Sequence, residues 1–367
     1  MEGSAPAEPR PSGSWTLHLQ PAPSGAGFLF AATAAAGELA GRMSQTIWTN
    51  HGFRPEALEL FKSGLAAGGH RLIHSPKSSA SVLAAGASDP SMNDADIAFG
   101  QPDVADAMRL TKLRYVALTT AGYTRYDTPE FRAAMTGRGT LVTSSSQVFA
   151  DPCAQQMLAA MLALARNLPA QLRNQDGPRE WRYLEDRFTA TVLTGQSVLL
   201  LGFGAIGRRL AELLAPFGGT VTAYRRTPRG DEGVRIVTDA GLSAALAAAD
   251  HVVNLLPDSP ATKRRMDSQR FAAMKRGARF YNVGRGTTVD QDALIAALKS
   301  GHVGAAYLDV MEPEPLPPAH PLWSAPNCFI TCHLGGGTGD QDVKLVKQFL
   351  ENLRRFQKGE ALIDRII

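Results

Sequence analysis

The chain has 367 residues, of which 44% are hydrophobic and 20% are charged. These values exclude a small disulfide-stapled scaffold and a disordered or collagen-like chain, and the length favours two domains or one large α/β unit. The net charge is +4, with 38 basic and 34 acidic side chains interspersed along the chain. We therefore expect no nucleic-acid partner, because such partners select a gathered basic face or tail.

The cysteine content and the apolar runs indicate the compartment. Cys153, Cys328 and Cys332 are an odd number without CxxC spacing, so neither a disulfide framework nor a metal site is expected. A reducing cytoplasm fits this cysteine usage best. The apolar stretch Gly27–Gly37 is well below the roughly 20 residues that cross a bilayer, and we expect no membrane span.

Residues 1–42 differ in composition from the rest of the chain, since they are rich in Ala, Pro, Gly and Ser without a sustained hydrophobic period. Such a segment buries too little apolar surface to fold, and we expect a disordered extension. It lacks the basic region that precedes the apolar core of a secretory signal. We expect the folded part to begin near Met43, with a strand-like segment at Ser44–Thr49.

From there to residue 145, short apolar runs alternate with amphipathic stretches such as Pro55–Ala66, a pattern typical of strands and helices in turn. A long helix is predicted over Asp151–Asn167, where apolar residues recur at helical spacing. That helix is apolar nearly all round, so we expect it to be buried. The strand candidates in this part are Thr46–Trp48, Arg71–His74, Ile97–Phe99, Tyr115–Thr119 and Leu141–Thr143.

From Gln196 onward the strand candidates are nearly continuous in apolar residues, which is typical of a parallel sheet buried on both faces. Helical patterns separate most of them, including one helix between an N-cap at Asp290 and a stop at Gly301. The last helix, about Asp340–Gln357, is amphipathic. The strand candidates are Ser197–Leu201, Thr220–Tyr224, Val234–Val237, His251–Leu256, Arg279–Val283, Ala305–Val310 and Phe329–Cys332.

A glycine-rich turn follows the first of these strands and opens a helix, in the order that a Rossmann dinucleotide-binding unit requires. We expect Gly202 to permit the tight turn, Gly204 to let the backbone approach a pyrophosphate, and Gly207 to allow close helix packing. The alternative is a purely structural turn. The segment reads Gly202-Phe203-Gly204-Ala205-Ile206-Gly207, and its five residues other than Phe203 are predicted cofactor contacts.

The end of the next strand bears on which dinucleotide is bound. NAD sites normally carry an acidic residue there for the ribose 2′-hydroxyl, but this chain has Arg225, Arg226 and Thr227, with no acidic residue before Asp231. Guanidinium groups can bind a 2′-phosphate, whereas a carboxylate would repel it. We predict NADP(H) as the preferred cofactor, with NAD(H) possible; the alternative is that the arginines form a solvated turn.

Three polar residues lie just past the ends of predicted parallel strands, where ligands bind in open α/β sheets. Arg285 can grip a substrate carboxylate in a fork and polarise a neighbouring carbonyl. His333 can deliver a proton near neutral pH, and a carboxylate such as Glu314 would favour its imidazolium form and fix its orientation. Together they suit the reduction of a 2-oxo acid.

Three segments resemble, in order and spacing, the D-2-hydroxyacid dehydrogenase family, which contains phosphoglycerate dehydrogenase and the glyoxylate/hydroxypyruvate reductases. The resemblance runs from about Met43 to the C-terminus. The segments are Tyr281-Asn282-Val283-Gly284-Arg285-Gly286-Thr287-Thr288-Val289-Asp290, Leu308-Asp309-Val310-Met311-Glu312-Pro313-Glu314-Pro315-Leu316-Pro317 with His320-Pro321-Leu322 after it, and Thr331-Cys332-His333-Leu334-Gly335-Gly336.

The resemblance implies a role for each of these residues. It assigns Arg285 to the substrate, His333 to acid/base work and Glu314, rather than Glu312, to the histidine. Asp309 resembles the family residue that contacts the nicotinamide carboxamide, with a structural cap as its alternative. The remaining implied contacts are Gly100, Gln101 and Gly122 for the substrate, and Pro257 and Val283 for the cofactor. Taken singly, each residue has an ordinary structural alternative, such as a surface salt bridge or a core histidine.

The chain also departs from the family pattern. The long helix usually carries Ala-Glu-His, but here it reads Ala154-Gln155-Gln156, which removes two titratable groups and bears on oligomer contacts or substrate preference. Cys332 replaces a common proline, and Met311 replaces an aromatic residue. Neither of these exchanges touches the proton or carboxylate chemistry.

We therefore expect a Rossmann-type domain of residues 146–333 inserted into a smaller flavodoxin-like α/β domain of residues 43–145 plus 334–367. The expected function is hydride transfer between a nicotinamide cofactor and a small 2-oxo or 2-hydroxy acid, without a metal. A homodimer is implied by the resemblance, with Asp151–Asn167 as a candidate interface. The alternatives are a dinucleotide-sensing corepressor-like protein and a formate dehydrogenase-like enzyme.

Overall fold

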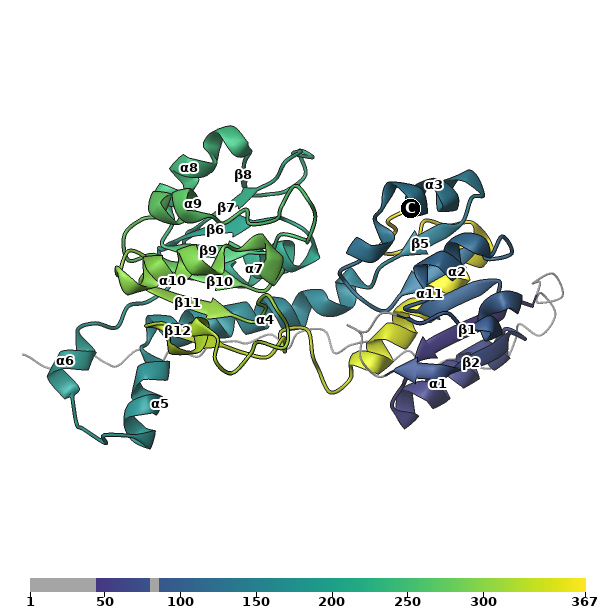
Figure 1. Ribbon diagram of the computed structural model, residues 1–367, viewed down its shortest axis with the longest axis horizontal. Coiled ribbons are helices and arrows are strands. Elements are labelled where there is room, and N and C mark those ends of the chain that lie inside the picture. Colours follow the sequence, from purple (N-terminus) through teal and green to yellow (C-terminus); the bar gives the residue numbers. More distant parts are fainter. Residues whose placement is uncertain (1–43, 80–85) are drawn as a thin grey trace, which may run out of the picture. The chain divides into compact units, whose positions relative to one another are not determined.

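The computed structural model describes residues 44–79 and 86–367 (Figure 1). The extension expected at residues 1–42 lies outside the described residues. The described chain forms two parallel sheets, one with strand order β2-β1-β3-β4-β5 and one with order β12-β11-β10-β9-β6-β7-β8. The predicted α/β class with a doubly wound parallel sheet is confirmed. The expected domain boundaries at residues 145 and 333 stay a prediction.

The smaller sheet is built from the first five strands and the helices between them. Its aromatic core includes Phe61, Phe99 and Phe349, whose rings lie 4.3–5.5 Å apart, so the last helix, α11, packs against the first, α1. The bounds are β1 Thr46–His51, α1 Pro55–Ala67, β2 Arg71–Ser79, β3 Ile97–Gly100, α2 Val104–Arg109, β4 Tyr115–Leu118, α3 Pro129–Gly137, β5 Leu141–Thr143 and α11 Gln341–Lys358.

The larger sheet comprises the remaining strands, and helices cover both of its faces. The bounds are α4 Ser146–Ala165, α5 Leu168–Asp176, α6 Tyr183–Arg187, β6 Ser197–Leu201, α7 Ala205–Leu214, β7 Thr220–Tyr224, β8 Arg235–Val237, α8 Asp239–Ala248, β9 His251–Asn254, α9 Ser268–Ala273, β10 Arg279–Asn282, α10 Gln291–Lys299, β11 Ala305–Leu308 and β12 Cys328–Ile330.

Helices pack on both faces of the larger sheet, and successive side chains of its strands enter the two hydrophobic clusters in turn. Val198 and Leu200 of β6 belong to one hydrophobic cluster with α4 and α7. Leu199 and Leu201 belong to a second cluster with α8, α9 and α10. Successive side chains of a strand point to opposite faces, so a strand covered by helices on both faces must be apolar at nearly every position.

The long helix differs from its prediction in extent and in burial. α4 begins at Ser146, five residues earlier than expected, and ends at Ala165 because Asn167 adopts a left-handed conformation with φ 55°. It is buried along the face that packs on α7, whereas Leu162 is 36% exposed. The prediction that this helix is buried therefore holds for one face only. By length and composition α4 would suffice to cross a membrane, but half of that window is buried inside the fold.

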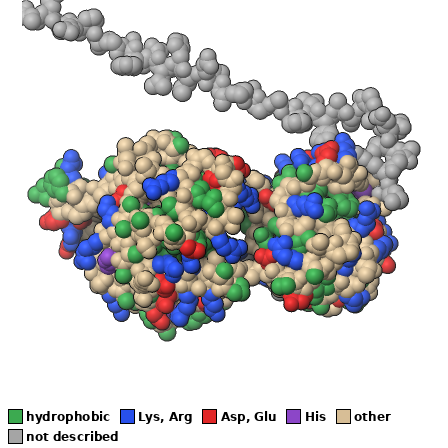
Figure 2. All heavy atoms as spheres, turned by 90° about the horizontal axis from the view of Figure 1, so that it is seen from above, with side chains coloured by type: hydrophobic (Ala, Val, Ile, Leu, Met, Phe, Trp, Pro, Cys, Tyr) green, Lys and Arg blue, Asp and Glu red, His purple; other side chains and the backbone are tan. Residues whose placement is uncertain are grey.

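The final residues of the chain join the smaller sheet. The Ser144 amide donates to the Asp364 carbonyl, and the Val142 amide donates to that of Ile367 at 3.2 Å. The C-terminal tail thus lies antiparallel beside β5, next to residues that lead into α4. Figure 2 shows Lys and Arg side chains spread over the visible surface of the described part with Asp and Glu among them.

Candidate active site

The glycine-rich turn connects β6 to α7, as the sequence predicts. Gly202 has φ +103°, in the left-handed half of backbone space that favours glycine, and a Cβ there would meet the Leu255 carbonyl oxygen at 3.2 Å. A Cβ at Gly207 would lie 3.0 Å from the Gly202 oxygen. Gly204 has open space around it and caps α7, whose first amides have no partner within the helix. This cradle fits the pyrophosphate of a dinucleotide.

The two arginines that follow β7 differ in their surroundings. Arg225 Nη1 lies 3.0 Å from Glu232 Oε1, and both side chains of this ion pair are largely buried. Glu232 also accepts the amides of Arg229 and Gly230, which folds the loop back on itself. Arg226 and Thr227 are exposed. This ion pair was not predicted, because no periodic sequence pattern links Arg225 to a carboxylate seven residues later.

A cavity of about 270 Å³ brings several of the predicted residues together. Ile206 lines it from α7, and Gly122 lines it from the loop after β4. Val283 and Asp309 line it from the segments that follow β10 and β11. The full lining is Thr120, Ala121, Gly122, Phe149, Cys153, Ile206, Val283, Arg285, Asp309, His333, Gly336, Gly337 and Gln341. The roles assigned to these residues stay predictions.

Arg285 is fixed at both ends. Its carbonyl oxygen accepts the Thr288 hydroxyl at 2.7 Å and the Asn282 side-chain amide at 3.2 Å. Its Nη1 donates to the Gly284 carbonyl at 2.6 Å, and a Cβ at Gly122 would overlap its Nη2. Burial lowers the pKa of the guanidinium, while the nearby carboxylates oppose that shift. The carboxylate of a substrate would form a favourable ion pair with this buried guanidinium.

His333 pairs with Glu314 through Nδ1, which lies 2.8 Å from Oε2. Because a carboxylate accepts at Nδ1, that nitrogen carries a proton and Nε2 remains for a ligand. The other oxygen of Glu314 accepts the Met311 amide at 2.9 Å. Burial alone would raise the pKa of Glu314, but the bonds from His333 and Met311 and the charge of Arg285 hold it below its ordinary value.

Asp309 is 1% exposed and binds the turn that carries His333. Its carbonyl accepts the His333 amide at 2.8 Å, and its carboxylate accepts the amides of Leu334 and Gly335 at 2.8 and 2.9 Å. His333 itself has φ 54°, a left-handed conformation that costs a residue with a side chain roughly 1–2 kcal/mol. The hydrogen bonds to Asp309 therefore hold this turn in its left-handed conformation.

Two of the predicted substrate residues do not line this cavity. The Gln101 backbone pairs with Asn50 through two hydrogen bonds of 2.8 Å. The Gln101 side chain donates to the hydroxyls of Thr119 and Thr120, so it supports the loop behind Gly122. Gly100, with φ +144°, approaches Asn50. Their role as direct substrate contacts stays a prediction.

Several lining residues were missed. Phe149 and Cys153 lie on α4 and line the cavity. Phe149 precedes the predicted helix, and an apolar position such as Cys153 within it indicates only core packing. Burial raises the pKa of the Cys153 thiol to about 12, so it stays neutral. Gln341 opens α11, and nothing in its local sequence distinguishes it from an ordinary first-turn residue.

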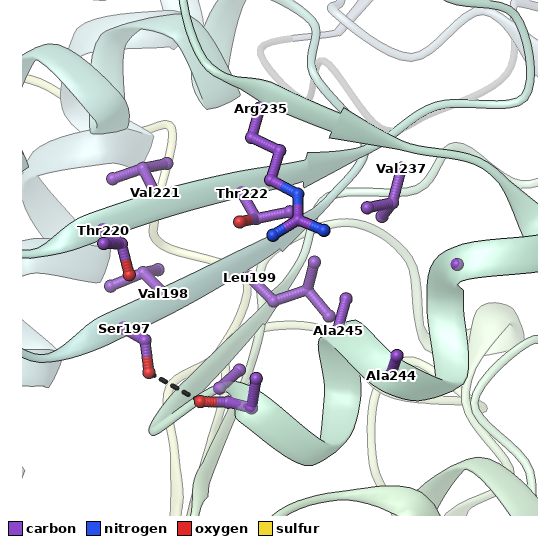
Figure 3. Close-up of a pocket in the computed structure, with 13 residues that line it drawn as sticks. Ser197, Val198, Leu199, Thr220, Val221, Thr222, Arg235, Val237, Ala244 and Ala245 are labelled. Carbon is purple, nitrogen blue, oxygen red and sulfur yellow. Dashed lines mark hydrogen bonds between the residues drawn. The ribbon is translucent and has the colours of Figure 1, made fainter.

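A larger hollow of about 620 Å³ lies between the starts of β6–β8 and α8 (Figure 3). Small side chains such as Ala244 and Ala245 face Leu199 across it, and Arg235 is the one charged residue among those that line it. It lies at the amino ends of the strands and contains no acid–base pair. Among the described residues, no group of three or more His, Cys, Asp or Glu is placed to hold a metal ion.

Residues 158–335 match the family described as D-isomer specific 2-hydroxyacid dehydrogenase, NAD binding domain. The chain is also 32% identical over 258 residues to glyoxylate/hydroxypyruvate reductase B of Citrobacter koseri, a match that covers 69% of this chain and 78% of that protein.

Solved structures similar to this one include the following two. A D-isomer specific 2-hydroxyacid dehydrogenase from Xanthobacter autotrophicus Py2, in complex with NADPH and MES, is 29% identical with a TM-score of 0.73, over 89% of this chain and 98% of that one. An NADPH-dependent glyoxylate/hydroxypyruvate reductase from Sinorhizobium meliloti, in complex with NADP and sulfate, is 25% identical with a TM-score of 0.70, over 88% and 98%.

Proposed function

The chain belongs to the D-isomer-specific 2-hydroxyacid dehydrogenase family, and from this premise we propose that it reduces a small 2-oxo acid to a 2-hydroxy acid with NADPH. One observation carries the proposal. Arg285 and His333 line one cavity of about 270 Å³ together with Ile206 of the glycine-rich segment and Val283, which follows β10. The expected cation for a carboxylate and the expected proton donor therefore face the same small space.

Each residue has a separate task in the proposed reaction. Arg285 binds the substrate carboxylate and polarises the adjacent carbonyl, whose oxygen gains negative charge as C2 is reduced. His333 donates the proton of Nε2 to that oxygen. The Nδ1 proton stays on the imidazole and remains hydrogen-bonded to Glu314. A bound nicotinamide supplies the hydride that C2 receives. The reaction balances, because the substrate gains one hydride and one proton while the imidazolium of His333 becomes a neutral imidazole.

The cradle of the cofactor is proposed to comprise the glycine-rich turn, Pro257, Val283 and Asp309. The preference for NADP(H) is supported by Arg226 and Thr227, which are exposed beside the end of β7. Arg225 contributes less charge to a 2′-phosphate than the sequence suggested, because Glu232 already neutralises it. The relative from Xanthobacter autotrophicus Py2, which is in complex with NADPH, supports the same preference.

The substrate class is proposed as small 2-oxo acids of the glyoxylate and hydroxypyruvate kind. The volume of the cavity and the name of the Citrobacter koseri relative support it. The test measures NADPH oxidation with glyoxylate, hydroxypyruvate, pyruvate and phenylpyruvate, beside NADP reduction with formate. Turnover of at least one 2-oxo acid supports the proposal. Turnover of formate alone favours the formate dehydrogenase alternative, and NADPH binding without any turnover favours a dinucleotide sensor.

We infer a homodimer from the surface of residues 168–188, a segment that contains α5 and α6, neither of which has a buried residue. Trp181, Leu184 and Phe188 are 93%, 65% and 77% exposed, a concentration of large apolar side chains that single chains seldom leave in water. We therefore propose residues 168–188 as an interface, and the candidate interface at Asp151–Asn167 stays a prediction. The cytoplasmic location stays a prediction from the free cysteines.

A further inference from the structure

Asp309 is connected to α4 by a chain of three hydrogen bonds outside the cavity. The Thr331 hydroxyl donates to Asp309 Oδ1 at 2.6 Å. The Tyr307 hydroxyl lies 2.7 Å from the Thr331 hydroxyl, and Gln156 Nε2 donates to the Tyr307 oxygen at 2.5 Å. Gln156 lies on α4, Tyr307 on β11, and Thr331 just after β12, so the chain links three elements.

The protons in this chain have a single consistent order. A hydroxyl can donate one hydrogen bond, and the Thr331 hydroxyl donates its bond to the Asp309 carboxylate. Thr331 must then accept from Tyr307, and Tyr307 must accept from the Gln156 amide. Burial raises the pKa of Tyr307, so its hydroxyl keeps the proton that it donates. Each bond in such a chain polarises and strengthens the next.

The carboxylate at the end of the chain holds the turn of His333. The amides of Leu334 and Gly335 donate to this carboxylate, and the His333 amide donates to the backbone carbonyl of Asp309. A Cβ at Gly335 would lie 2.8 Å from Asp309 Oδ2, so the close approach depends on the glycine. Because His333 has a left-handed backbone, its direction is set by these external bonds and by Glu314.

We propose that Thr331 and Tyr307 are positioning residues, which fix Asp309 and through it the turn that aims His333 at the substrate. The inference rests on the proposed function only in taking His333 as the proton donor. It differs from the family-implied role of Asp309 as a nicotinamide contact, because the bonds described here run from Asp309 to the histidine turn. Neither Thr331 nor Tyr307 lines the cavity.

The test compares Thr331→Val with Thr331→Ser and Tyr307→Phe. Valine removes the hydroxyl with little change of shape, whereas serine retains it. Thr331→Val should lower kcat for the best 2-oxo acid about fivefold or more, since a hydrogen bond to a charged group is lost, while the Kd for NADPH alone stays within about twofold. Thr331→Ser should restore most of the kcat, and Tyr307→Phe should give a smaller loss in the same direction.

A second measurement needs no turnover. Hydrogen exchange of the amides of Leu334 and Gly335 should be faster in Thr331→Val than in Thr331→Ser, because the carboxylate that accepts them is less well held. If the wild-type protein reduces no 2-oxo acid, the proposed function is wrong. The exchange rates still test whether Thr331 positions the turn. An unchanged exchange rate, or a raised NADPH Kd with unchanged kcat, would overturn the positioning role.

Discussion

Arg285 and His333 have different proposed roles. Arg285 stays charged and binds the substrate carboxylate, whereas His333 transfers a proton. Arg285→Ala should raise KM for the 2-oxo acid steeply, because the carboxylate loses its buried partner. His333→Ala should lower kcat by roughly 100- to 10,000-fold with a smaller effect on KM, as expected for loss of a general acid. Steady-state kinetics at saturating NADPH separates the two effects. Near wild-type turnover of His333→Ala would show that another group supplies the proton.

The guanidinium of Arg285 depends on the absence of a side chain at Gly122. A Cβ there would overlap Nη2, so Gly122→Ala should displace the guanidinium and lower kcat/KM for the 2-oxo acid by about 100-fold. Gly137→Ala is a matched control, since a Cβ at Gly137 has nothing within 4 Å. Equal kcat/KM values for the two variants would refute the proposed contact.

At the scale of elements, the loop between β7 and β8 should determine the choice of cofactor. Arg226→Ala should lower kcat/KM for NADPH by about tenfold and leave that for NADH nearly unchanged, because only NADPH carries the 2′-phosphate. NADH therefore serves as the internal control in the same variant. An equal or higher kcat/KM with NADH in the wild-type protein would end the proposed preference.

The strands of the larger sheet were predictable because burial on both faces leaves an almost continuous apolar run. β6 and β7 have the predicted bounds, whereas β9 ends at Asn254 rather than at Leu256. Leu255 and Leu256 remain buried or half-buried after the strand has ended, so their apolar character carried no information about the boundary. Apolar patterning reports burial, and hydrogen bonding determines where a strand stops.

The parts that were missed carry no periodic apolar pattern in the sequence. α5 and α6 have no buried face, so a pattern of core positions was absent from the sequence. The pair of Arg225 with Glu232 and the bonds of Asp309 to the His333 turn depend on loop conformations. The candidate residues Arg285, Glu314 and His333 were found because each follows a strand end, a position that the topology brings to one edge of the sheet.

At the scale of the whole molecule, the stability should fall in acid partly because of His251. Burial lowers the pKa of His251 from its ordinary 6.5 to about 4, and its two ring nitrogens contact Tyr281 and Gln196. Between these values the unfolded chain binds a proton that the folded chain excludes. The contribution of His251 to the free energy of unfolding should therefore decrease by about 1.4 kcal/mol per pH unit on acidification from pH 6.5 to 4.

Urea unfolding at pH 7.5, 5.5 and 4.5 measures this dependence. Above pH 6.5 the histidine is neutral in both states and contributes no slope. His251→Gln removes the titrating group, so the difference in unfolding free energy between the variant and the wild-type protein should change over the acidic interval. Parallel pH dependences for the two proteins would exclude His251 as a source.

The proposed homodimer is tested through the apolar surface of α5 and α6. The wild-type protein should sediment as a dimer at micromolar concentration, and Trp181→Ser combined with Phe188→Ser should shift it toward the monomer, since large aromatic side chains dominate interface energies. The same double substitution should leave the far-ultraviolet circular dichroism unchanged, because both side chains are exposed. A wild-type monomer under these conditions would contradict the proposal.

The transfer of deuterium from NADPH labelled at both C4 positions to a 2-oxo acid tests the whole account most directly. The wild-type protein should produce a 2-hydroxy acid with the label on C2, detected by mass spectrometry, whereas Arg285→Ala and His333→Ala should bind NADPH with similar Kd values and form almost no labelled product. Equal label transfer by the His333 variant, or none by the wild-type protein with any 2-oxo acid, would contradict the assignment of this cavity as the reducing site.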